Sequence, residues 1–210
     1  MFTEVHKKHI KKLTSFQVSI DDIGMKFNSS YVMYFWEKPL MDLHAKYLIQ
    51  NQKAKNVLEI GFGLGVFAKS IYDLGIDSYT VVEPHPEVVN YAKQWQQSLV
   101  NPDKIKIIQA PWQLAIDKLQ NYQIIMYDTW PPDGYSNIDF NNFINSVCRI
   151  KLDKGGRFSF FSSGSSIDNF RYNILEKEKY KIDLYNYKLF DPPPYWNKET
   201  CDFIIPIAQK

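Results

Sequence analysis

Two carboxylates, Glu37 and Asp128, lie in surroundings that are unusual for acidic residues. Glu37 follows Trp36 in the apolar run "VMYFWEKPLM", and Asp128 ends the apolar part of "IIMYDTWP". Acidic side chains are rarely buried unless they are paired or take part in chemistry. Each has a simpler interpretation, because Glu37 could begin a helix with Pro39 in its first turn, and Asp128 could start the turn-rich "TWPPDG". Taken together, the pair is our candidate reaction centre.

A glycine-rich turn, "VLEIGFGLG", follows a predicted strand and precedes a predicted helix. Gly61, Gly63 and Gly65 permit a tight turn and let a ligand approach the backbone amides. Glu83 ends the next predicted strand, at close to the roughly 20 residues expected between the first glycine and an acid that binds ribose hydroxyls. This spacing predicts a nucleoside cofactor.

The glycine spacing also bears on which nucleoside is bound. A dinucleotide site of the form G-x-G-x-x-G would need a third glycine where this chain has Val66, or Ala68 in the alternative frame. Glu59 instead places an acid ahead of the first glycine, in the pattern E-x-G-x-G-x-G. NAD binding and a turn without any ligand remain the alternatives.

The elements that must position these residues alternate between helix and strand after about residue 39, which predicts an α/β domain with a parallel sheet. The patterns predict helices at 39–50, 66–75, 86–97, after Pro111 and at 140–150, and strands at 56–60, 78–83, 104–109, 122–128, 155–163, 180–190 and 200–209. We expect this sheet domain to span residues 39–210. Residues 1–38 are expected to form an N-terminal extension or lid that contributes to the substrate site.

Composition narrows the class of protein. The chain has 210 residues, 45% of them hydrophobic, and a formal net charge of +2, which favours one globular domain without a strongly basic nucleic-acid surface. No run of eighteen apolar residues and no secretory leader pattern is found, so we expect a cytoplasmic protein without a membrane partner, as a monomer or homodimer. Cys148 and Cys201 show no metal or redox spacing, and no metal site is expected.

The motifs resemble those of one family. "VLEIGFGLG" resembles motif I of the class I S-adenosylmethionine-dependent methyltransferases. "VMYFWEKPLM" is similar to VMERWETPYM, "IIMYDTWP" to ILYDTYP and "APWQ" to GLWE of the guanidinoacetate N-methyltransferases. The resemblance implies a Rossmann-like fold with a seven-stranded, mostly parallel sheet and an N-terminal helical extension. It implies S-adenosylmethionine as cofactor, S-adenosylhomocysteine as product, and a cofactor site formed by Met33, Glu59, Gly61, Gly63, Gly65, Glu83, Pro84, Pro111, Trp112 and Asp128.

In that family the carboxylates matching Glu37 and Asp128 grip the guanidino group of the acceptor, so both are predicted to be catalytic. A guanidinium is a poor nucleophile, because its lone pair is delocalised and its pKa lies above about 12. Two carboxylates can hold the positive charge on the two non-reacting nitrogens of the guanidinium while its third nitrogen attacks the methyl group. We expect Asp128 to accept the proton. The predicted substrate-binding residues are Trp36, Thr129, Trp130, Tyr135, Ser163 and Gly164.

The chain departs from the family pattern at positions near the substrate, including the arginine expected to bind the acceptor's carboxylate. Tyr34 and Gln113 stand where the family has acids, and no arginine precedes Arg149 to meet a substrate carboxylate. We therefore expect a small guanidine without a carboxylate, such as a cyclic alkaloid precursor. A small amine, a protein arginine and a non-catalytic binding module remain alternatives. The segment "DPPPYW" at 191–196 resembles a nucleic-acid methyltransferase motif, but its place after the sixth strand predicts a rigid loop that could close over the substrate.

Overall fold

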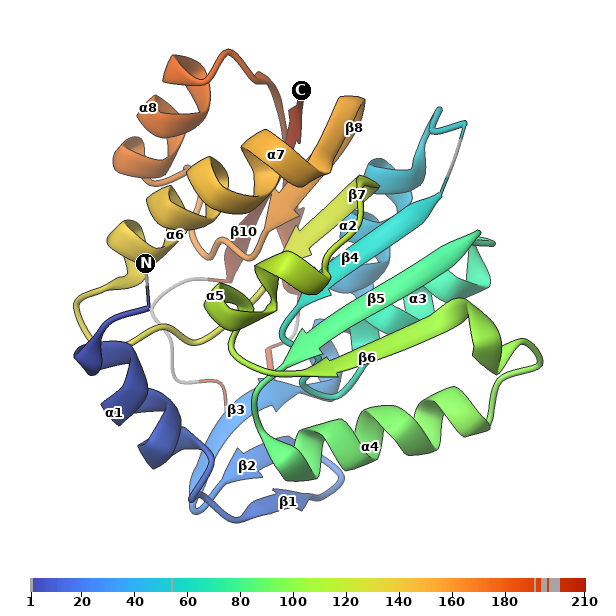
Figure 1. Cartoon of the computed structure of the whole chain (residues 1–210), viewed down its shortest axis with the longest axis vertical. Helices are drawn as coiled ribbons and strands as arrows, with labels where there is room; N and C mark the ends of the chain where they lie inside the picture. The colour runs from blue at the N-terminus through green and yellow to red at the C-terminus, as the bar shows by residue number, and fades with distance from the viewer. Residues whose placement is uncertain (1, 54, 191, 194–195, 197–200) are drawn as a thin grey trace.

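The computed structural model describes residues 2–53, 55–190, 192–193, 196 and 201–210. Its centre is a seven-stranded sheet in the order β6-β5-β4-β7-β8-β10-β9 (Figure 1). Only β10 runs antiparallel to its neighbours, so the predicted mostly parallel sheet is confirmed. The strands are β4 (Asn56–Ile60), β5 (Ser78–Glu83), β6 (Ile105–Gln109), β7 (Tyr122–Tyr127), β8 (Leu152–Phe160), β9 (Lys181–Lys188) and β10 (Asp202–Gln209).

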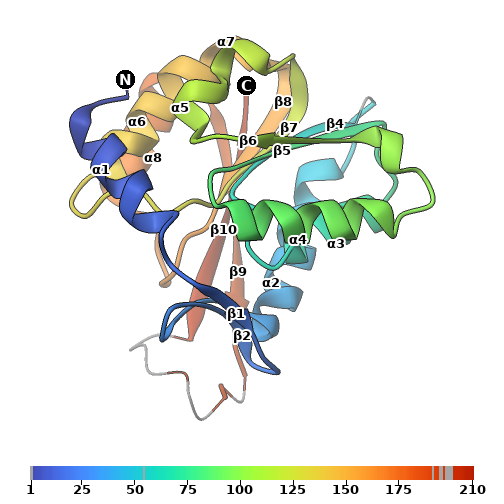
Figure 2. The same ribbon diagram turned by 60° about the horizontal axis from the view of Figure 1, so that its bottom comes forward.

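Helices cover both faces of this sheet (Figure 2). One face carries α2 (Lys38–Ile49), α3 (Val66–Asp73) and α4 (Pro86–Gln97), and the other carries α5 (Trp112–Ala115), α6 (Ser136–Phe143), α7 (Arg149–Lys151) and α8 (Asn169–Lys177). Because side chains alternate along a strand, Val57 of β4 joins the first core and Leu58 joins the second. Burial on both faces explains why these strands read as short, continuous apolar runs.

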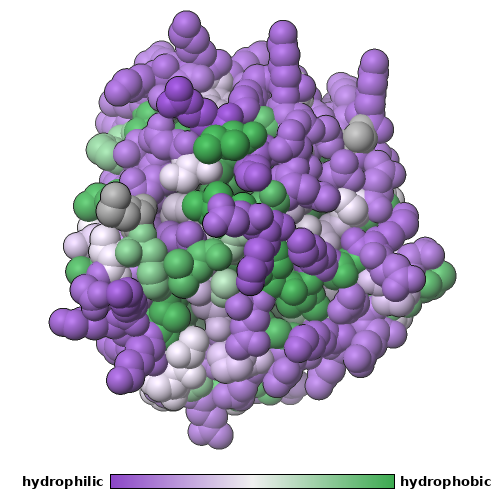
Figure 3. All heavy atoms as spheres, in the orientation of Figure 1, coloured by the Kyte–Doolittle hydropathy of each residue, from purple (hydrophilic) through white to green (hydrophobic). Residues whose placement is uncertain are grey.

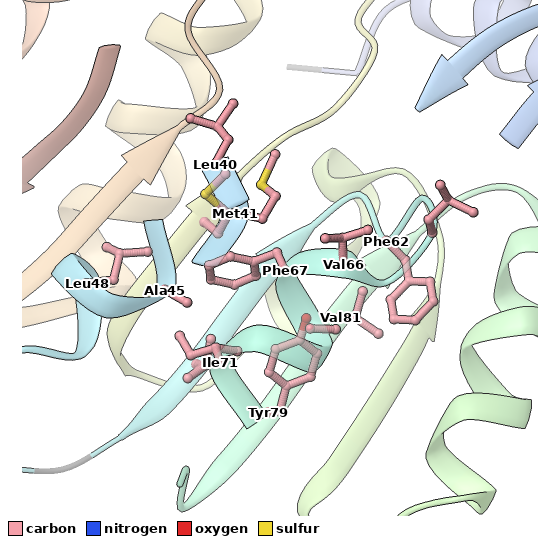
Figure 4. Packing of buried hydrophobic residues seen from close by; sticks show 14 of the residues in the cluster. Leu40, Met41, Ala45, Leu48, Phe62, Val66, Phe67, Ile71, Tyr79 and Val81 are labelled. Atoms are coloured by element: carbon pink, nitrogen blue, oxygen red, sulfur yellow. The ribbon is translucent and has the colours of Figure 1, made fainter. Parts of the chain in front are cut away.

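The first core joins α2 and α3 to the sheet. Leu40, Met41 and Ala45 of α2 meet Phe67 and Ile71 of α3, with side chains of β5 below them (Figure 4). All five are buried to at least 98%. At roughly 25 cal/mol per Å² of buried apolar area, each large side chain contributes about 1.5–3 kcal/mol to folding. This packing fixes α2, which Glu37 immediately precedes, against α3 and the sheet.

The N-terminal extension contains more than the predicted helix. Helix α1 (Glu4–Leu13) is followed by a small antiparallel sheet of β1 (Val18–Ile20), β2 (Gly24–Phe27) and β3 (Ser30–Tyr34). A two-residue turn with Asn28 at a φ of 56° joins β2 to β3. We did not predict this sheet, because its strands are short and partly exposed and so lack a strong alternating pattern.

Two further elements differ from the prediction. The helix predicted at 140–150 is broken into α6, a π-helical turn at Ile144–Cys148 and α7, and helix α8 was not predicted. Only Leu175 of α8 is buried, so its apolar periodicity is weak. Within the described residues, no helix is long and apolar enough to cross a membrane. Asp191, Pro194 and Tyr195 lie outside the described residues, so the predicted loop at 191–196 is not tested.

Candidate active site

A cavity of about 390 Å³ lies beyond the carboxyl ends of the parallel strands, where open α/β sheets bind their ligands. The extension, through α1, β2 and β3, forms one wall, and the loops after β4, β5 and β7 form the other. Its lining residues are Leu13, Met25, Phe27, Tyr31, Val32, Met33, Tyr34, Glu37, Glu59, Gly61, Phe62, Gly63, Phe67, Glu83, Pro84, Val88, Asp128, Thr129, Trp130 and Phe161. Of the twenty, four are acids and none is Lys, Arg or His.

The glycine-rich turn passes very close to other segments of this cavity. Gly61 has a φ of 86°, and a Cβ there would collide with the backbone carbonyl of Asp128. Gly63 has a φ of 53°, and a Cβ there would collide with the sulfur of Met33, which also accepts the Leu64 N–H at 3.1 Å. Glycine at both positions therefore lets the turn lie against β7 and β3 at once. Gly65 caps α3 and does not line the cavity.

Glu83 ends β5 and is 6% exposed. Its two oxygens accept the backbone N–H groups of Phe62 at 3.0 Å and His85 at 2.8 Å, which fixes the orientation of the carboxyl group. Burial raises the pKa of Glu83 to about 7, although the two backbone hydrogen bonds act in the opposite direction. Each oxygen keeps a second acceptor site, so this group suits the two hydroxyls of a ribose.

Glu59, on β4, is 2% exposed and accepts the hydroxyl hydrogen of Tyr79. Burial raises the pKa of Glu59 well above its usual range; the Tyr79 hydrogen bond opposes this effect, and the charges of Asp128 and Glu83 add to it. Three carboxyl groups thus gather at one edge of the sheet. Such a cluster favours a cationic ligand, and S-adenosylmethionine carries both a sulfonium and an ammonium group.

Glu37 and Asp128 line the same cavity although they are far apart in the sequence. Glu37 ends a short 3₁₀ turn, Phe35–Glu37, and its carboxylate accepts the Tyr34 N–H at 3.1 Å. It also precedes α2, so the helix-start interpretation holds, and the same side chain, 8% exposed, reaches the cavity. Asp128 directly follows β7, where its N–H donates to the Ile60 carbonyl at 3.0 Å.

A second cavity, of about 30 Å³, adjoins the first, and Pro84, Thr129 and Trp130 line both. Pro111 and Trp112, which the resemblance assigns to the cofactor site, lie in this smaller cavity beneath α1. The structure thus places the predicted nucleoside residues on two adjoining surfaces. The smaller cavity is the part of the site that α1 covers.

A buried acid that we did not predict organises the smaller cavity. Asp139 of α6 is 1% exposed and accepts hydrogen bonds from Trp112 at 3.0 Å, Gln113 at 2.8 Å and Tyr127 at 2.5 Å. His6 of α1 lies 3.4 Å from the same carboxylate. An acid in "SNIDFNNF" reads as an ordinary solvated helix residue, so only the contacts with three other elements show its role.

The predicted substrate residues divide into two groups. Thr129 and Trp130 line the cavities. Trp36 packs against Trp196 and Phe203, with ring centroids 4.5 Å and 5.7 Å away, and does not line either cavity. Tyr135, Ser163 and Gly164 also lie outside both linings: Tyr135 packs edge-on against His6, Ser163 bridges to Phe203, and the Gly164 N–H donates to the Asp202 carbonyl at 2.8 Å.

The hairpin β2-β3 adds cavity residues that the sequence did not indicate. Phe27, Tyr31 and Tyr34 line the larger cavity, and Phe27 stacks on Trp130 at 6.3 Å. The available signal was Asn28, because Asn tolerates the positive φ that a two-residue hairpin turn requires. Since this hairpin carries both Met33 and the approach to Glu37, it belongs to the site.

The strand order, the glycine-rich turn over the central strand and the acid at the end of the neighbouring strand define a class I S-adenosylmethionine-dependent methyltransferase domain. Comparison with known proteins agrees. Residues 6–183 match the guanidinoacetate N-methyltransferase family, and the chain belongs to that family. Family membership, together with a structural neighbour solved with the cofactor bound, makes S-adenosylmethionine the cofactor. The residues of the predicted cofactor site suit this molecule: the cluster of Glu59, Glu83 and Asp128 favours a cation, and the turn at Gly61 and Gly63 has no side chain to block a ligand.

Curated relatives are named protein arginine N-methyltransferase 2. The protein of Kluyveromyces lactis is 26% identical over 181 residues, which cover 83% of this chain and 43% of the relative. The protein of Saccharomyces cerevisiae is 26% identical over 200 residues, covering 88% of this chain and 47% of the relative. The chain thus spans less than half the length of these two relatives.

Solved structures with the same fold include two methyltransferases. N-methyltransferase NodS from Bradyrhizobium japonicum WM9 has a TM-score of 0.63 at 14% identity, covering 83% of this chain and 96% of that one. Magnesium protoporphyrin IX methyltransferase from Synechocystis PCC 6803, solved with bound S-adenosylmethionine, has a TM-score of 0.60 at 12% identity. It covers 83% of this chain and 80% of that one. These likenesses establish the class I methyltransferase fold.

Proposed function

We propose that the chain transfers a methyl group to a guanidino nitrogen of an acceptor that has no carboxylate beside the reacting group. The observation that carries the proposal is the joint placement of Glu37 and Asp128 in the wall of one cavity. Two carboxylates in a cavity whose described lining residues include no Lys, Arg or His form a site for a cation. Such a pair suits the planar fork of a guanidinium, which donates up to five hydrogen bonds.

The cofactor would be held from both ends. Glu83 would accept hydrogen bonds from the ribose hydroxyls, and the turn at Gly61 and Gly63 would lie against the methionine portion near Glu59. When bound, S-adenosylmethionine supplies a methyl group on a positively charged sulfur. The N-terminal hairpin and the apolar lining, which includes Phe27 and Phe161, exclude water from the acceptor.

Glu37 and Asp128 would lower the barrier by controlling charge in the acceptor. Their negative charges hold positive charge on the nitrogens they contact, which leaves more lone-pair density on the third nitrogen. That nitrogen forms the new N–C bond as the methyl–sulfur bond breaks, and the bonding pair stays on sulfur. Removing the proton first would cost roughly 8 kcal/mol across about six pKa units, so proton transfer to Asp128 accompanies or follows methyl transfer.

The acceptor's remainder should lack a carboxylate. Among the described residues that line the cavity, none is cationic, so a buried acceptor carboxylate would face four acids without a cationic partner. A small guanidine, such as a cyclic alkaloid precursor, meets this requirement and is our preferred acceptor. An arginine side chain in a protein meets it as well, and the names of the curated relatives favour that second candidate.

The experiment that tests the proposal incubates the protein with S-adenosylmethionine and three acceptors, and follows methylated products by mass spectrometry. The acceptors are guanidinoacetate, a small guanidine without a carboxylate, and an arginine-containing peptide with blocked termini. We expect a higher specificity constant for a carboxylate-free acceptor than for guanidinoacetate. Efficient methylation of guanidinoacetate, or methylation of amines alone, would refute the proposed acceptor class.

A further inference from the structure

We propose that His85 is a positioning residue that couples docking of the N-terminal segment, residues 2–17, to the ribose-binding acid Glu83. His85 follows Glu83 by two residues and is 0% exposed. The inference rests on the proposed role of Glu83 in holding the cofactor. It concerns how the extension is attached to that acid, which the proposed function does not address.

The hydrogen bonds of His85 fix its tautomer. Its Nδ1 lies 3.2 Å from the Glu87 N–H and accepts that bond, which caps the N-terminus of α4. In a neutral imidazole ring only one nitrogen carries a proton, so a ring whose Nδ1 accepts a hydrogen bond has its proton on Nε2. Nε2 lies 3.0 Å from the Phe16 carbonyl, so it donates to the segment that joins α1 to β1.

The backbone and the ring of His85 complete the connection. Its N–H donates to the Glu83 carboxylate at 2.8 Å, and its ring stacks on Phe27 with centroids 4.9 Å apart and planes 28° apart. Phe27 in turn stacks on Trp130 in the loop after β7. His85 thus connects Glu83 and the start of α4 to two parts of the extension, the α1–β1 connection and the β2-β3 hairpin.

The segment that His85 holds covers the smaller cavity. His6 of α1 approaches Asp139 at 3.4 Å, and His9 bonds the Trp130 carbonyl at 2.9 Å. With α1 docked, only about 30 Å³ remains between it and Trp112, so the cofactor would lie in the adjoining larger cavity beside Glu83, with α1 closing that side of it. The outer side of α1 presents hydrophilic side chains to solvent (Figure 3), so its inner side is the one committed to docking.

Docking through His85 should therefore slow cofactor release. If the hydrogen bond between His85 and the Phe16 carbonyl is lost, α1 is held by fewer contacts. It then uncovers its side of the cofactor site more often. One net hydrogen bond of ordinary strength corresponds to about a three- to tenfold change in that equilibrium. The rate of S-adenosylmethionine dissociation should rise by the same factor, because release follows opening.

Two substitutions separate this role from helix capping. In H85N, the amide oxygen takes the place of Nδ1 and keeps the cap on Glu87, since Asn is a strong N-cap residue, but the contact with Phe16 is lost. In H85Q, the longer amide places a donor near the position of Nε2 and keeps the contact with Phe16, but loses the cap. A matched control is H44N, because His44 is equally buried, bonds Ser159 at 2.7 Å and lies outside both cavity linings.

The measurements are hydrogen exchange of residues 2–17 in the ligand-free protein and the dissociation rate of S-adenosylmethionine. We expect H85N to raise both about three- to tenfold, H85Q to stay closer to wild type in both, and H44N to lower the Tm without changing either. The opposite order, with H85N like wild type and H85Q impaired, would reduce His85 to a helix cap and overturn the inference. Failure of the wild type to bind cofactor would refute the proposed function instead, while the exchange arm would still decide the role of His85.

Discussion

Replacing Glu37 by Gln tests the proposed reaction centre most directly. The carboxylate accepts the Tyr34 N–H at 3.1 Å, and the amide oxygen of Gln can accept the same bond with nearly the same shape. The 3₁₀ turn should therefore keep its cap, and the free energy of unfolding should change by no more than about 0.5 kcal/mol. If Glu37 only starts α2, turnover should also be unchanged.

The expected effect on catalysis is much larger. Removing a charge that faces a guanidinium forfeits a charge-assisted hydrogen bond of about 1.5–3 kcal/mol, and also the localisation of charge that the reaction needs. At 1.36 kcal/mol per factor of ten, turnover should fall by about two orders of magnitude or more. S-adenosylmethionine affinity should remain nearly constant, because Glu37 is expected to contact the acceptor and not the nucleoside.

The assay is single-turnover methyl transfer to the best acceptor, with cofactor binding measured by calorimetry on the same samples. D128N should be at least as damaging as E37Q. The double variant should be far less than additive, because both acids act on one group. E176Q, on the exposed surface of α8, is the matched control for loss of a carboxylate charge elsewhere. Near wild-type turnover by E37Q would return Glu37 to a purely structural role.

Further predictions concern Glu83, Gly61 and His44. E83A should weaken S-adenosylmethionine binding by at least about tenfold in calorimetry. In the wild type, affinity should rise from pH 6 to pH 8, because the pKa of Glu83 is about 7 and the carboxylate is the better ribose acceptor; a flat profile would contradict this. G61A should abolish cofactor binding or folding, since its Cβ meets the Asp128 carbonyl, and a functional G61A would refute the close approach. Burial lowers the pKa of His44 to about 3, so the unfolded chain takes up the proton first and the protein loses stability as the pH falls below about 6.5, by roughly 2–3 kcal/mol at pH 4.5. Urea titrations of H44Q should show a shallower loss.

The elements after residue 39 could be predicted because their signals are local. Strands β4, β5 and β7 are short apolar runs: β4 has Glu59 as its next-to-last residue, β5 ends at Glu83 and β7 directly precedes Asp128. Helix Pro86–Gln97 has the helix period over its whole length. Helix α8 and the β2-β3 hairpin could not be predicted in this way. Their residues are half exposed, so the apolar pattern that marks a buried face is weak.

The candidate site shows the same division. Gly61, Glu83 and Asp128 could be predicted to lie together, because each follows or ends a predicted strand and the carboxyl ends of adjacent parallel strands meet at one edge of a sheet. The place of Trp36 was not predictable in the same way. An aromatic residue next to an acid can face the cavity or the core, and the packing of Trp36 against Phe203 of β10 decides for the core.

The sequence by itself determined the class of sheet, the glycine-rich turn and the acids at the ends of the strands. These depend on the period of side chains along a strand and on the backbone freedom of glycine, which are properties of short segments. Only the tertiary structure decided that the β2-β3 hairpin closes the cavity, that Asp139 collects Trp112 and Tyr127, and that His85 ties Phe16 to Glu83. The physical reason is that burial and hydrogen bonding between distant segments set the surroundings of each group, and no local pattern records which segment will supply the partner.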